Sequence, residues 1–226
     1  GQVVEAVNFN SPGQIVIGGH AEAVDRAIAL FAQRGIRKAV KLAVSVPSHT
    51  PLMREAAASL GLACIELPGF EADDIIATYA RTLANAGGEV VIASPDKDLM
   101  QLMGAGIRIY DPANDKFLNH LNASEKFGVP PHQVCDAQAL IGDTTDNIPG
   151  APSIGPVTAG ELLAKFGTVE ALIARVDEVE PARWRDVIRA SSSDILLSKQ
   201  LATLRTDVPL GPISKLALSD VDAERA

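Results

Sequence analysis

The sequence is poor in cysteine and has no long apolar run, and each absence narrows the class of protein. Its 226 residues include two cysteines, Cys64 and Cys135, in no spacing that is typical of a zinc site or a redox pair. We therefore expect reduced core thiols in a cytoplasmic protein. No stretch of about 18 apolar residues is present and the N-terminus lacks a basic-then-apolar signal, so we expect a soluble protein that is neither secreted nor membrane-bound.

Basic residues are also scarce, at 20 Lys and Arg against 28 Asp and Glu, which gives a formal net charge of -8. Nonspecific binding to nucleic acid is usually driven by basic patches, so this charge argues against that class. Carboxylates gathered at a divalent-cation site would account for part of the acidic excess. The hydrophobic share of 47% is enough for one large or two small cores.

Strand and helix patterns alternate along the first third of the chain. Residues 3–8 and 14–18 read as two strands joined by the turn residues 11–13. A helical pattern over 20–34 ends at Gly35, and residues 38–46 read as a third strand. Thr50-Pro51 then begins a second helix. These patterns predict an N-terminal ββαβ segment followed by a helix.

The alternation continues beyond Gly61 and then stops. We predict strands at 63–67, 89–94 and 107–111, with helices at 71–88 and 97–104. Strands separated by helices of this length favour an α/β fold with a mainly parallel sheet flanked by helices. From about residue 122 only short helical patterns remain, and residues 212–226 have weak periodicity and look peripheral. The second part is therefore expected to be all-helical.

Acidic side chains follow several of these predicted strands and turns. One group opens the helix after the turn 68–70, a second follows the strand at 89–94, and a third flanks the turn 142–150. Ligands of α/β sheets bind beyond the carboxyl ends of the strands, so these groups could meet at one rim. Hard oxygen ligands select Mg²⁺ or Mn²⁺. The seven candidate metal-binding and catalytic residues are Glu71, Asp73, Asp74, Asp96, Asp98, Asp143 and Asp146.

Each acidic group also has a simpler interpretation. Acidic residues in the first turn of a helix are stabilised by the helix dipole, so Glu71, Asp73 and Asp74 could be capping residues. The segment 94–98 could be a solvated turn, and 143–147 an Asx-rich loop. Spacing alone leaves both interpretations open.

The segment 148–167 adds a second kind of site. It reads as a turn, a glycine-bounded hairpin and a helix that begins near Pro156. Backbone amides at such a helix N-terminus bind phosphate oxygens without a basic side chain. An ordinary tight turn between packed helices is the alternative. The candidate DNA-binding residues are Ser153, Ile154, Gly155, Pro156, Val157, Thr158 and Ala159.

From about residue 59 to 210 the chain resembles the 5'-nuclease domain at the N-terminus of bacterial DNA polymerase I, a relative of the flap endonucleases. The resemblance rests on PGFEADDIIATYA, SPDKDLMQL, KFGVPPHQVCDAQALIGDTTDNIPG, SIGPVTAGELLAKFGTVEAL and LSKQLATLRTDVPL. It implies that the seven carboxylates are metal ligands and that 148–167 is a helix-hairpin-helix element that grips duplex or 5'-flap DNA, with K⁺ at the hairpin. Val157 stands where the family hairpin usually has Lys.

The N-terminal part departs from that family. The family's first two strands each supply an Asp to the metals and are followed by a basic arch, and these features are missing. Residues 1–57 instead resemble the small subdomain of malonyl-CoA:acyl carrier protein transacylase, through GQVVEAVNFNSPGQIVIGGHAEAVDRA and LAVSVPSHTPLM. His49 matches the catalytic His of that family, but no G-x-S-x-G nucleophile elbow accompanies it. We therefore expect neither acyl transfer nor an acyl carrier protein partner.

These resemblances lead to the hypothesis of a chimera in three parts. Residues 1–57 would form a transacylase-like segment that completes the sheet, 58–121 the α/β metal-site part, and 122–226 the helical DNA-binding part. Three interpretations stay open: an active metal-dependent 5'-nuclease, a DNA-binding scaffold with impaired catalysis, and a folding chimera without activity that could self-associate through a non-native interface. Six basic residues could face DNA or simply solvate helices: Lys165, Arg183, Arg185, Arg189, Lys199 and Arg205.

Overall fold

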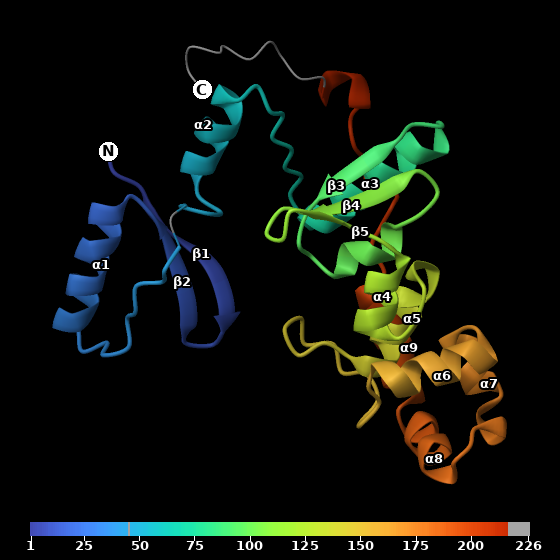
Figure 1. Cartoon of the computed structure of the whole chain (residues 1–226). Helices are drawn as coiled ribbons and strands as arrows, with labels where there is room; N and C mark the ends of the chain where they lie inside the picture. Colours follow the sequence, from blue (N-terminus) through green and yellow to red (C-terminus); the bar gives the residue numbers. More distant parts are fainter. Residues whose placement is uncertain (45, 217–226) are drawn as a thin grey trace. The chain divides into compact units, whose positions relative to one another are not determined.

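The computed structural model describes residues 1–44 and 46–216 and divides the chain into two compact units (Figure 1). The first contains residues 1–66 together with the segment from Gly211 onward, and the second contains residues 67–210. Of our expectation for 212–226, residues 217–226 lie outside the described residues. None of the described helices is long and apolar enough to cross a membrane.

The first unit begins with a β-hairpin. Strands β1 (Val4–Ser11) and β2 (Gln14–Gly19) pair antiparallel, and Gly13 turns the chain between them with a φ of 86°. Helix α1 (Ala21–Gln33) follows and packs on β2, and helix α2 (Pro51–Ser59) begins at the proline that the sequence indicated. The predictions of two strands and two helices in this segment are confirmed.

The predicted third strand of the N-terminal segment is not present. Among the described residues of 38–46, which exclude Ser45, no strand is assigned, and Val40, Leu42, Val44 and Val46 are exposed. Strands β1 and β2 form a two-stranded sheet of their own, so the expectation that this segment completes the larger sheet is wrong. Alternating apolar residues favour a strand only when a partner strand is available to pair with it.

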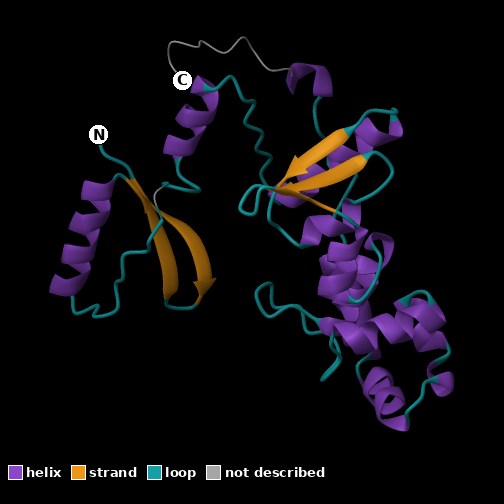
Figure 2. Ribbon diagram, in the orientation of Figure 1, coloured by secondary structure: helices purple, strands orange, loops and turns teal. Residues whose placement is uncertain are grey.

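The larger sheet lies in the second unit and has three strands (Figure 2). Strand β3 (Val90–Ala93) pairs parallel with β4 (Ile107–Asp111), and β4 pairs antiparallel with β5 (Lys116–Leu118). Helix α3 (Ala72–Asn85) and the 3-10 helix η1 (Asp98–Leu102) pack against this sheet. The sheet is therefore smaller and more mixed than the mainly parallel sheet that we expected.

Two further sequence expectations fail in this region. Residues 63–67 form no strand, and Cys64 is exposed rather than part of a core. Cys135 is partly buried, and its thiol donates to the Oε1 atom of Gln101 at 2.9 Å. Strand β5, in contrast, was not predicted, because three residues are too short to show an alternating pattern.

Helices make up the rest of the second unit, as the loss of strand patterns after residue 122 predicted. Helix α5 packs against both α9 and α6, and α7 contacts α6 and α9. The α-helices are α4 (His120–Phe127), α5 (Val134–Ile141), α6 (Pro156–Phe166), α7 (Val169–Ala174), α8 (Ala182–Ala190) and α9 (Ser192–Ala202). Short 3-10 turns of this unit are η2 (Pro131–Gln133) and η3 (Val176–Glu178), while η4 (Ile213–Leu216) belongs to the first unit.

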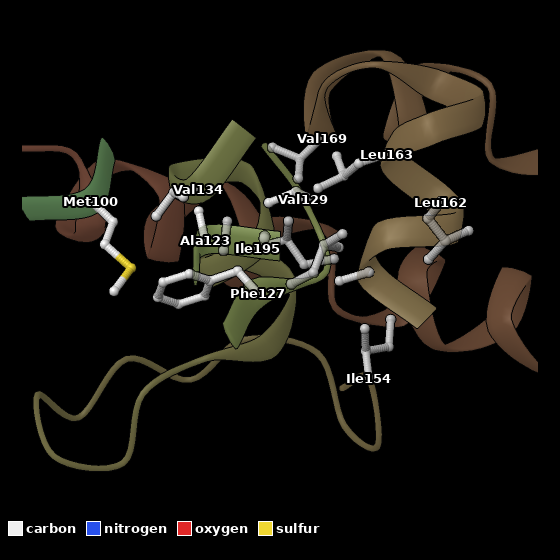
Figure 3. Close-up of a cluster of buried hydrophobic side chains, with 14 of the residues drawn as sticks. Met100, Ala123, Phe127, Val129, Val134, Ile154, Leu162, Leu163, Val169 and Ile195 are labelled. Atoms are coloured by element: carbon white, nitrogen blue, oxygen red, sulfur yellow. The ribbon is translucent and has the colours of Figure 1, made fainter. Parts of the chain in front are cut away.

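One hydrophobic cluster joins the sheet to these helices (Figure 3). Phe127 and Val134 from the α4–α5 region meet Leu163 of α6 and Ile195 of α9 there. The backbones of α4 and α6 come together at two glycines, because a Cβ atom on Gly160 would lie 2.5 Å from the carbonyl oxygen of Gly128. This close contact fixes α6 relative to α4.

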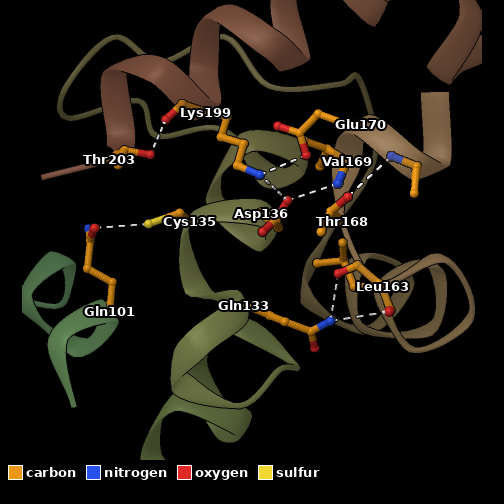
Figure 4. A network of polar contacts seen from close by, with 12 residues as sticks. Gln101, Gln133, Cys135, Asp136, Leu163, Thr168, Val169, Glu170, Lys199 and Thr203 are labelled. Atoms are coloured by element: carbon orange, nitrogen blue, oxygen red, sulfur yellow. Dashed lines mark hydrogen bonds and ion pairs between the residues drawn. The ribbon is translucent and has the colours of Figure 1, made fainter. Parts of the chain in front are cut away.

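A buried ion pair joins α5 to α9 (Figure 4). The Asp136 carboxylate accepts from Lys199 Nζ at 2.8 Å and from the backbone N–H of Val169 at 2.9 Å, and Lys199 also binds the more exposed Glu170 at 2.8 Å. Burial lowers the pKa of Lys199, but the hydrogen bonds to Asp136 and Glu170 outweigh it and raise that pKa above its ordinary value. The pair thus ties α5, α7 and α9 together around a charged centre.

Candidate functional site

The first acidic group lies where the sequence placed it, at the start of α3. The turn 68–70 uses Gly69 with a φ of 88°, and Glu71 is the N-cap residue of the helix without a side-chain capping bond. Glu71 is exposed, whereas Asp73 and Asp74 in the first turn are half-buried. Asp73 and Asp74 thus lie where the helix dipole favours acidic residues, while Glu71 makes no side-chain capping hydrogen bond.

The second group follows β3. Asp96 accepts a hydrogen bond of 2.9 Å from the backbone N–H of Asp98 through its Oδ1 atom, which forms an Asx turn. This turn starts η1, so the predicted helix at 97–104 is a short 3-10 segment. Asp96 is exposed and Asp98 is half-buried. Both carboxylates therefore emerge beyond the carboxyl end of a sheet strand, as predicted.

The third group lies in a closed loop between α5 and α6. Asp143 and Ile148 exchange backbone hydrogen bonds of 2.9 and 2.7 Å, and the Asp143 side chain accepts from the backbone N–H of Thr145 at 2.8 Å. At the end of the loop the backbone N–H of Gly150 donates to the Ser198 hydroxyl of α9 at 3.0 Å. The carboxylates of Asp143 and Asp146 are held on this loop.

Helix α3, which carries the first group, packs against η1, which begins with Asp98 of the second group. The pKa of Asp73 is raised from 3.8 to about 6, first by burial and then by the negative charges of Asp96, Asp98, Glu71 and Asp74, in that order. Like charges disfavour ionisation of a neighbouring carboxyl. The start of α3 and the segment after β3 thus form one acidic rim.

Lys97 connects the third group to this rim. Its Nζ atom lies 2.6 Å from Asp143 Oδ2, 3.3 Å from Asp98 Oδ1 and 3.8 Å from Asp146 Oδ2. Partial burial lowers the pKa of Lys97, but the hydrogen bond to Asp143 and the charges of Asp98 and Asp143 raise it overall. The same contacts lower the pKa of Asp143 despite its partial burial. One ammonium group therefore bridges two separate stretches of the chain.

Gln138 contacts the same carboxylate oxygen of Asp98 as Lys97 does. Its Nε2 atom donates to Asp98 Oδ1 at 2.5 Å, and the residue is 2% exposed. Its Oε1 atom is buried without a hydrogen-bond partner among the described residues. Sequence reasoning assigned no role to Gln138 or Lys97. The Lys between two acidic residues in the segment 96–98 was the available signal for Lys97, and nothing in the sequence distinguished Gln138.

The donor set suits a hard divalent cation, although the observed spacing does not enclose one. Within residues 1–44 and 46–216, no three His, Cys, Asp or Glu side chains are grouped so that they could hold a metal ion. The residues at the rim are nevertheless carboxylates, the ligands that Mg²⁺ and Mn²⁺ prefer. The repulsion that raises the pKa of Asp73 is the kind that a bound cation relieves.

The hairpin residues precede and begin α6. Gly155 is the N-cap residue, Pro156 is the first helical residue, and Ser153 has a φ of 63°. Ile154 and Ala159 are buried in the core and Val157 is 75% exposed, while Thr158 is half-buried. The buried pair anchors the hairpin, and its exposed positions present backbone and an apolar side chain rather than a charge.

Most residues of the expected basic stripe are already paired with acids. Arg185 binds Glu180, Arg189 binds Asp177, and Arg205 binds Asp207. Lys199 belongs to the buried pair described above, Lys165 donates to the carbonyl of Glu178, and Arg183 lies over the Trp184 ring. This pairing favours the interpretation that these residues stabilise helix surfaces.

His49 lies in the first unit, whereas the acidic rim belongs to the second. It is an exposed residue in the turn before α2, with a φ of 61°. The interpretation of a polar turn residue remains the one that we prefer.

Comparison with known proteins identifies the family. The profile of the 5'-3' exonuclease N-terminal resolvase-like domain matches residues 35–128, and that of the 5'-3' exonuclease C-terminal SAM fold matches residues 129–224. Flap endonuclease Xni of Yersinia enterocolitica is 39% identical over 176 residues, which cover 77% of this chain and 70% of that protein. The chain therefore belongs to the 5'-3' exonuclease family of DNA polymerase I and the flap endonucleases.

Other relatives are longer than this chain. DNA polymerase I of Rhizobium leguminosarum is 48% identical over 159 residues, covering 70% of this chain and 16% of that protein. The 5'-3' exonuclease of Aquifex aeolicus is 38% identical over 160 residues, covering 71% of this chain and 54% of that protein. The chain thus spans between about a sixth and about half of the length of these two relatives.

Solved structures support the same fold. A point mutant of T5 5'-exonuclease matches with a TM-score of 0.60 and 20% identity, over 80% of each chain. A structure of T5 5'-exonuclease with bound zinc matches with a TM-score of 0.57 and 24% identity, over 63% of this chain and 53% of the other. The match to the N-terminal resolvase-like domain begins at residue 35 and includes residues 35–57, which we assigned to the transacylase-like segment.

Proposed function

We propose that this protein is a divalent-metal-dependent DNA 5'-nuclease of the 5'-3' exonuclease or flap endonuclease type. The observation that carries the proposal is the acidic rim, where burial and the carboxylates of α3 and of the segment after β3 raise the pKa of Asp73 to about 6. Crowded carboxylates of this kind occur where a cation offsets their repulsion. Membership of the 5'-3' exonuclease family supplies the reaction class.

The proposed cofactor is Mg²⁺ or Mn²⁺. Such ions supply an activated water and stabilise the developing charge of a phosphodiester during hydrolysis. The residues that would hold them are the seven carboxylates of the acidic rim and the closed loop. Those residues are Glu71, Asp73, Asp74, Asp96, Asp98, Asp143 and Asp146. Gln138 orients Asp98 through its hydrogen bond of 2.5 Å.

The proposed DNA-binding element is the helix-hairpin-helix formed by α5, the loop after it and α6. Residues 153–159 would present backbone N–H groups to the phosphates of duplex or 5'-flap DNA, and K⁺ would bind at the hairpin. Val157 is exposed at the point where a basic side chain would add a phosphate contact. We therefore expect binding through backbone groups and a shallow dependence on salt.

A second candidate is a DNA-binding member of the family with impaired cleavage. The observation that favours it is the spacing of the carboxylates, none of which are grouped to hold a metal ion in the described part of the chain. The two aspartate-bearing strands and the basic arch of the family have no counterpart within residues 1–57. Loss of a metal ligand weakens positioning of the ion, so cleavage would be slow while DNA binding persists.

The chimeric origin is kept as a proposal for the region outside the family match. Residues 1–34 precede that match and belong to a compact unit that is distinct from residues 67–210. Their transacylase-like pattern supports an origin separate from the nuclease part, with no acyl-transfer function. A malonyl-transfer assay that gives turnover would contradict this.

The deciding experiment is cleavage of a labelled 5'-flap DNA with Mg²⁺ or Mn²⁺, beside the Asp146→Asn variant and a binding curve in Ca²⁺. Cleavage that disappears in the variant supports the nuclease. Binding without cleavage supports the second candidate. If the folded protein neither binds nor cleaves the DNA, both candidate functions are rejected and the inactive chimera is left.

A further inference from the structure

Lys97 is placed to do more than neutralise one carboxylate. Its ammonium contacts Asp98, its neighbour in the chain, and also Asp143 and Asp146 on the closed loop, which is distant in sequence. The side chain of Asp143 is 9% exposed and that of Lys97 is 27% exposed, so the closest pair is largely shielded from water. A partly buried pair of this kind is screened less than a surface ion pair.

We propose that Lys97 is an internal counter-ion that holds the closed loop against η1 and must withdraw from Asp98 and Asp143 before a divalent cation can bind them. This inference rests on the proposed function and concerns how its acidic rim is filled. It assigns to Lys97 a positioning role rather than a catalytic one.

Competition follows from the distances. Mg²⁺ binds oxygen ligands at about 2.0–2.1 Å and needs nearly ideal octahedral geometry. An ammonium 2.6 Å from Asp143 Oδ2 and 3.3 Å from Asp98 Oδ1 occupies the space between those two carboxylates. Its charge would also repel a cation that approached the same oxygens. Both cations cannot hold these two carboxylates together.

The side chain of Lys97 can move away, while Asp98 and Asp143 are each held by other contacts. Lysine carries its charge on a flexible four-carbon stem, and this stem is partly exposed. Asp98 is held separately by buried Gln138. Asp143 keeps the backbone N–H of Thr145 as a donor. Withdrawal of Lys97 therefore frees two carboxylates that are already oriented.

With Lys97 in place, the carboxylates of the loop and of η1 are spaced around an ammonium group. Removal of that group leaves neighbouring negative charges without their cation, and this increases the gain from binding another one.

The test uses the full chain, stripped of metal and without DNA, and measures Mn²⁺ binding by titration calorimetry. Lys97→Met keeps the length of the side chain and removes its charge, and we expect the Mn²⁺ dissociation constant to fall roughly fivefold, the effect of one partly screened ion pair. Lys97→Arg keeps the charge and should bind Mn²⁺ no more tightly than the unchanged protein. Lys126→Met removes the same charge from the exposed face of α4 and serves as the matched control.

Thermal unfolding checks that the variants fold. In chelator, Lys97→Met should have a lower melting temperature than the unchanged protein. Addition of Mn²⁺ should raise the melting temperature of Lys97→Met by more than it raises that of the unchanged protein. Unchanged or weaker Mn²⁺ binding by folded Lys97→Met overturns the inference, as does an equal effect of Lys126→Met or no Mn²⁺ binding by any of the proteins. If Lys97→Met binds Mn²⁺ more tightly but the unchanged protein does not cleave DNA, the role of Lys97 is kept and the nuclease is rejected. If the unchanged protein cleaves DNA but Lys97→Met has the same Mn²⁺ affinity, the nuclease is kept and the role of Lys97 is rejected.

Discussion

The side-chain carboxylate of Asp74 accepts a hydrogen bond of 2.8 Å from the backbone N–H of Arg205, 131 residues further along the chain. Thr78, one turn later on α3, donates to the Arg205 carbonyl and accepts from the backbone N–H of Val208, both at 3.3 Å. The segment that follows α9 is thus fastened along α3. Asp74 is therefore held by a backbone donor of the segment after α9, as Asp98 is held by the side chain of Gln138.

Replacing Asp74 with Ala should destabilise the second unit by about 1–2 kcal/mol, because the Arg205 N–H loses a charged acceptor. Asp74→Asn keeps an acceptor oxygen at the same place and should lose less than half as much. Urea unfolding measures both. Equal losses in the two variants would show that the negative charge, rather than the hydrogen bond, matters.

Stability should depend on pH through Asp73. Its pKa in the folded protein is about 6 against an ordinary value of 3.8, so the folded state binds a proton more tightly than the unfolded state. The resulting stabilisation is complete below about pH 4 and is lost as pH rises through about 6. In chelator at neutral pH, Asp73→Asn should therefore unfold at a higher temperature than the unchanged protein, and the difference should vanish at the acid end of this range.

The matched control for Asp73 is Asp186→Asn on α8, which removes the same charge from a 74%-exposed side chain outside the acidic rim. Its melting temperature relative to the unchanged protein should show no comparable trend over the same pH range. A flat pH profile for Asp73→Asn would mean that the rim charges are already neutralised in solution.

The buried pair Asp136–Lys199 should be sensitive to loss of one partner. Lys199→Met leaves the 9%-exposed Asp136 side chain without its cation, and we expect a loss of about 3 kcal/mol. Glu170→Gln removes only the outer arm, whose side chain is 55% exposed, and should cost less than about 1 kcal/mol. Denaturant titration distinguishes them, and similar losses for both would refute a special role for the buried arm.

At the contact between α4 and α6 we expect Gly160→Ala to destabilise the protein, although helix propensity alone predicts the opposite. Alanine usually stabilises a helix by about 1 kcal/mol relative to glycine. At Gly160, however, the added Cβ would lie 2.5 Å from the Gly128 carbonyl, so Gly160→Ala should destabilise the protein by more than about 2 kcal/mol. Gly155→Ala meets no atom within 4 Å, and we expect it to cost only about 1 kcal/mol, because Ala is a poorer N-cap residue than Gly. A stable Gly160→Ala protein would contradict the packing of these helices.

Local patterns predicted the elements that depend on local interactions. The helix predicted at 71–88 corresponds to α3, in which Ile75, Ala77 and Ala80 are buried. The segments 38–46 and 63–67 had strand-like composition but form no strand among the described residues, because pairing depends on a distant partner. Strand β5 depends on its antiparallel pairing with β4, and its three residues are too few to predict that pairing from the sequence.

The candidate site shows the same division. Sequence placed the carboxylates after the strand and turns where the structure finds them, because backbone direction sets where a strand or helix begins and ends. The sequence did not predict the side chains and backbone groups that contact those carboxylates. Lys97, Gln138 and Arg205 approach them from the start of η1, from α5 and from the segment after α9, and only tertiary packing brings these together.

The closed loop between Gly142 and Gly150 consists of a hydrogen-bonded base and an exposed tip. Its two ends are so close that a Cβ on Gly150 would collide with the backbone of Gly142, and the hydrogen bonds between Asp143 and Ile148 seal the base. The tip at 144–147 is exposed. The sealed base thus joins the loop to the rest of the second unit independently of the tip, which carries Asp146 and its contact with Lys97.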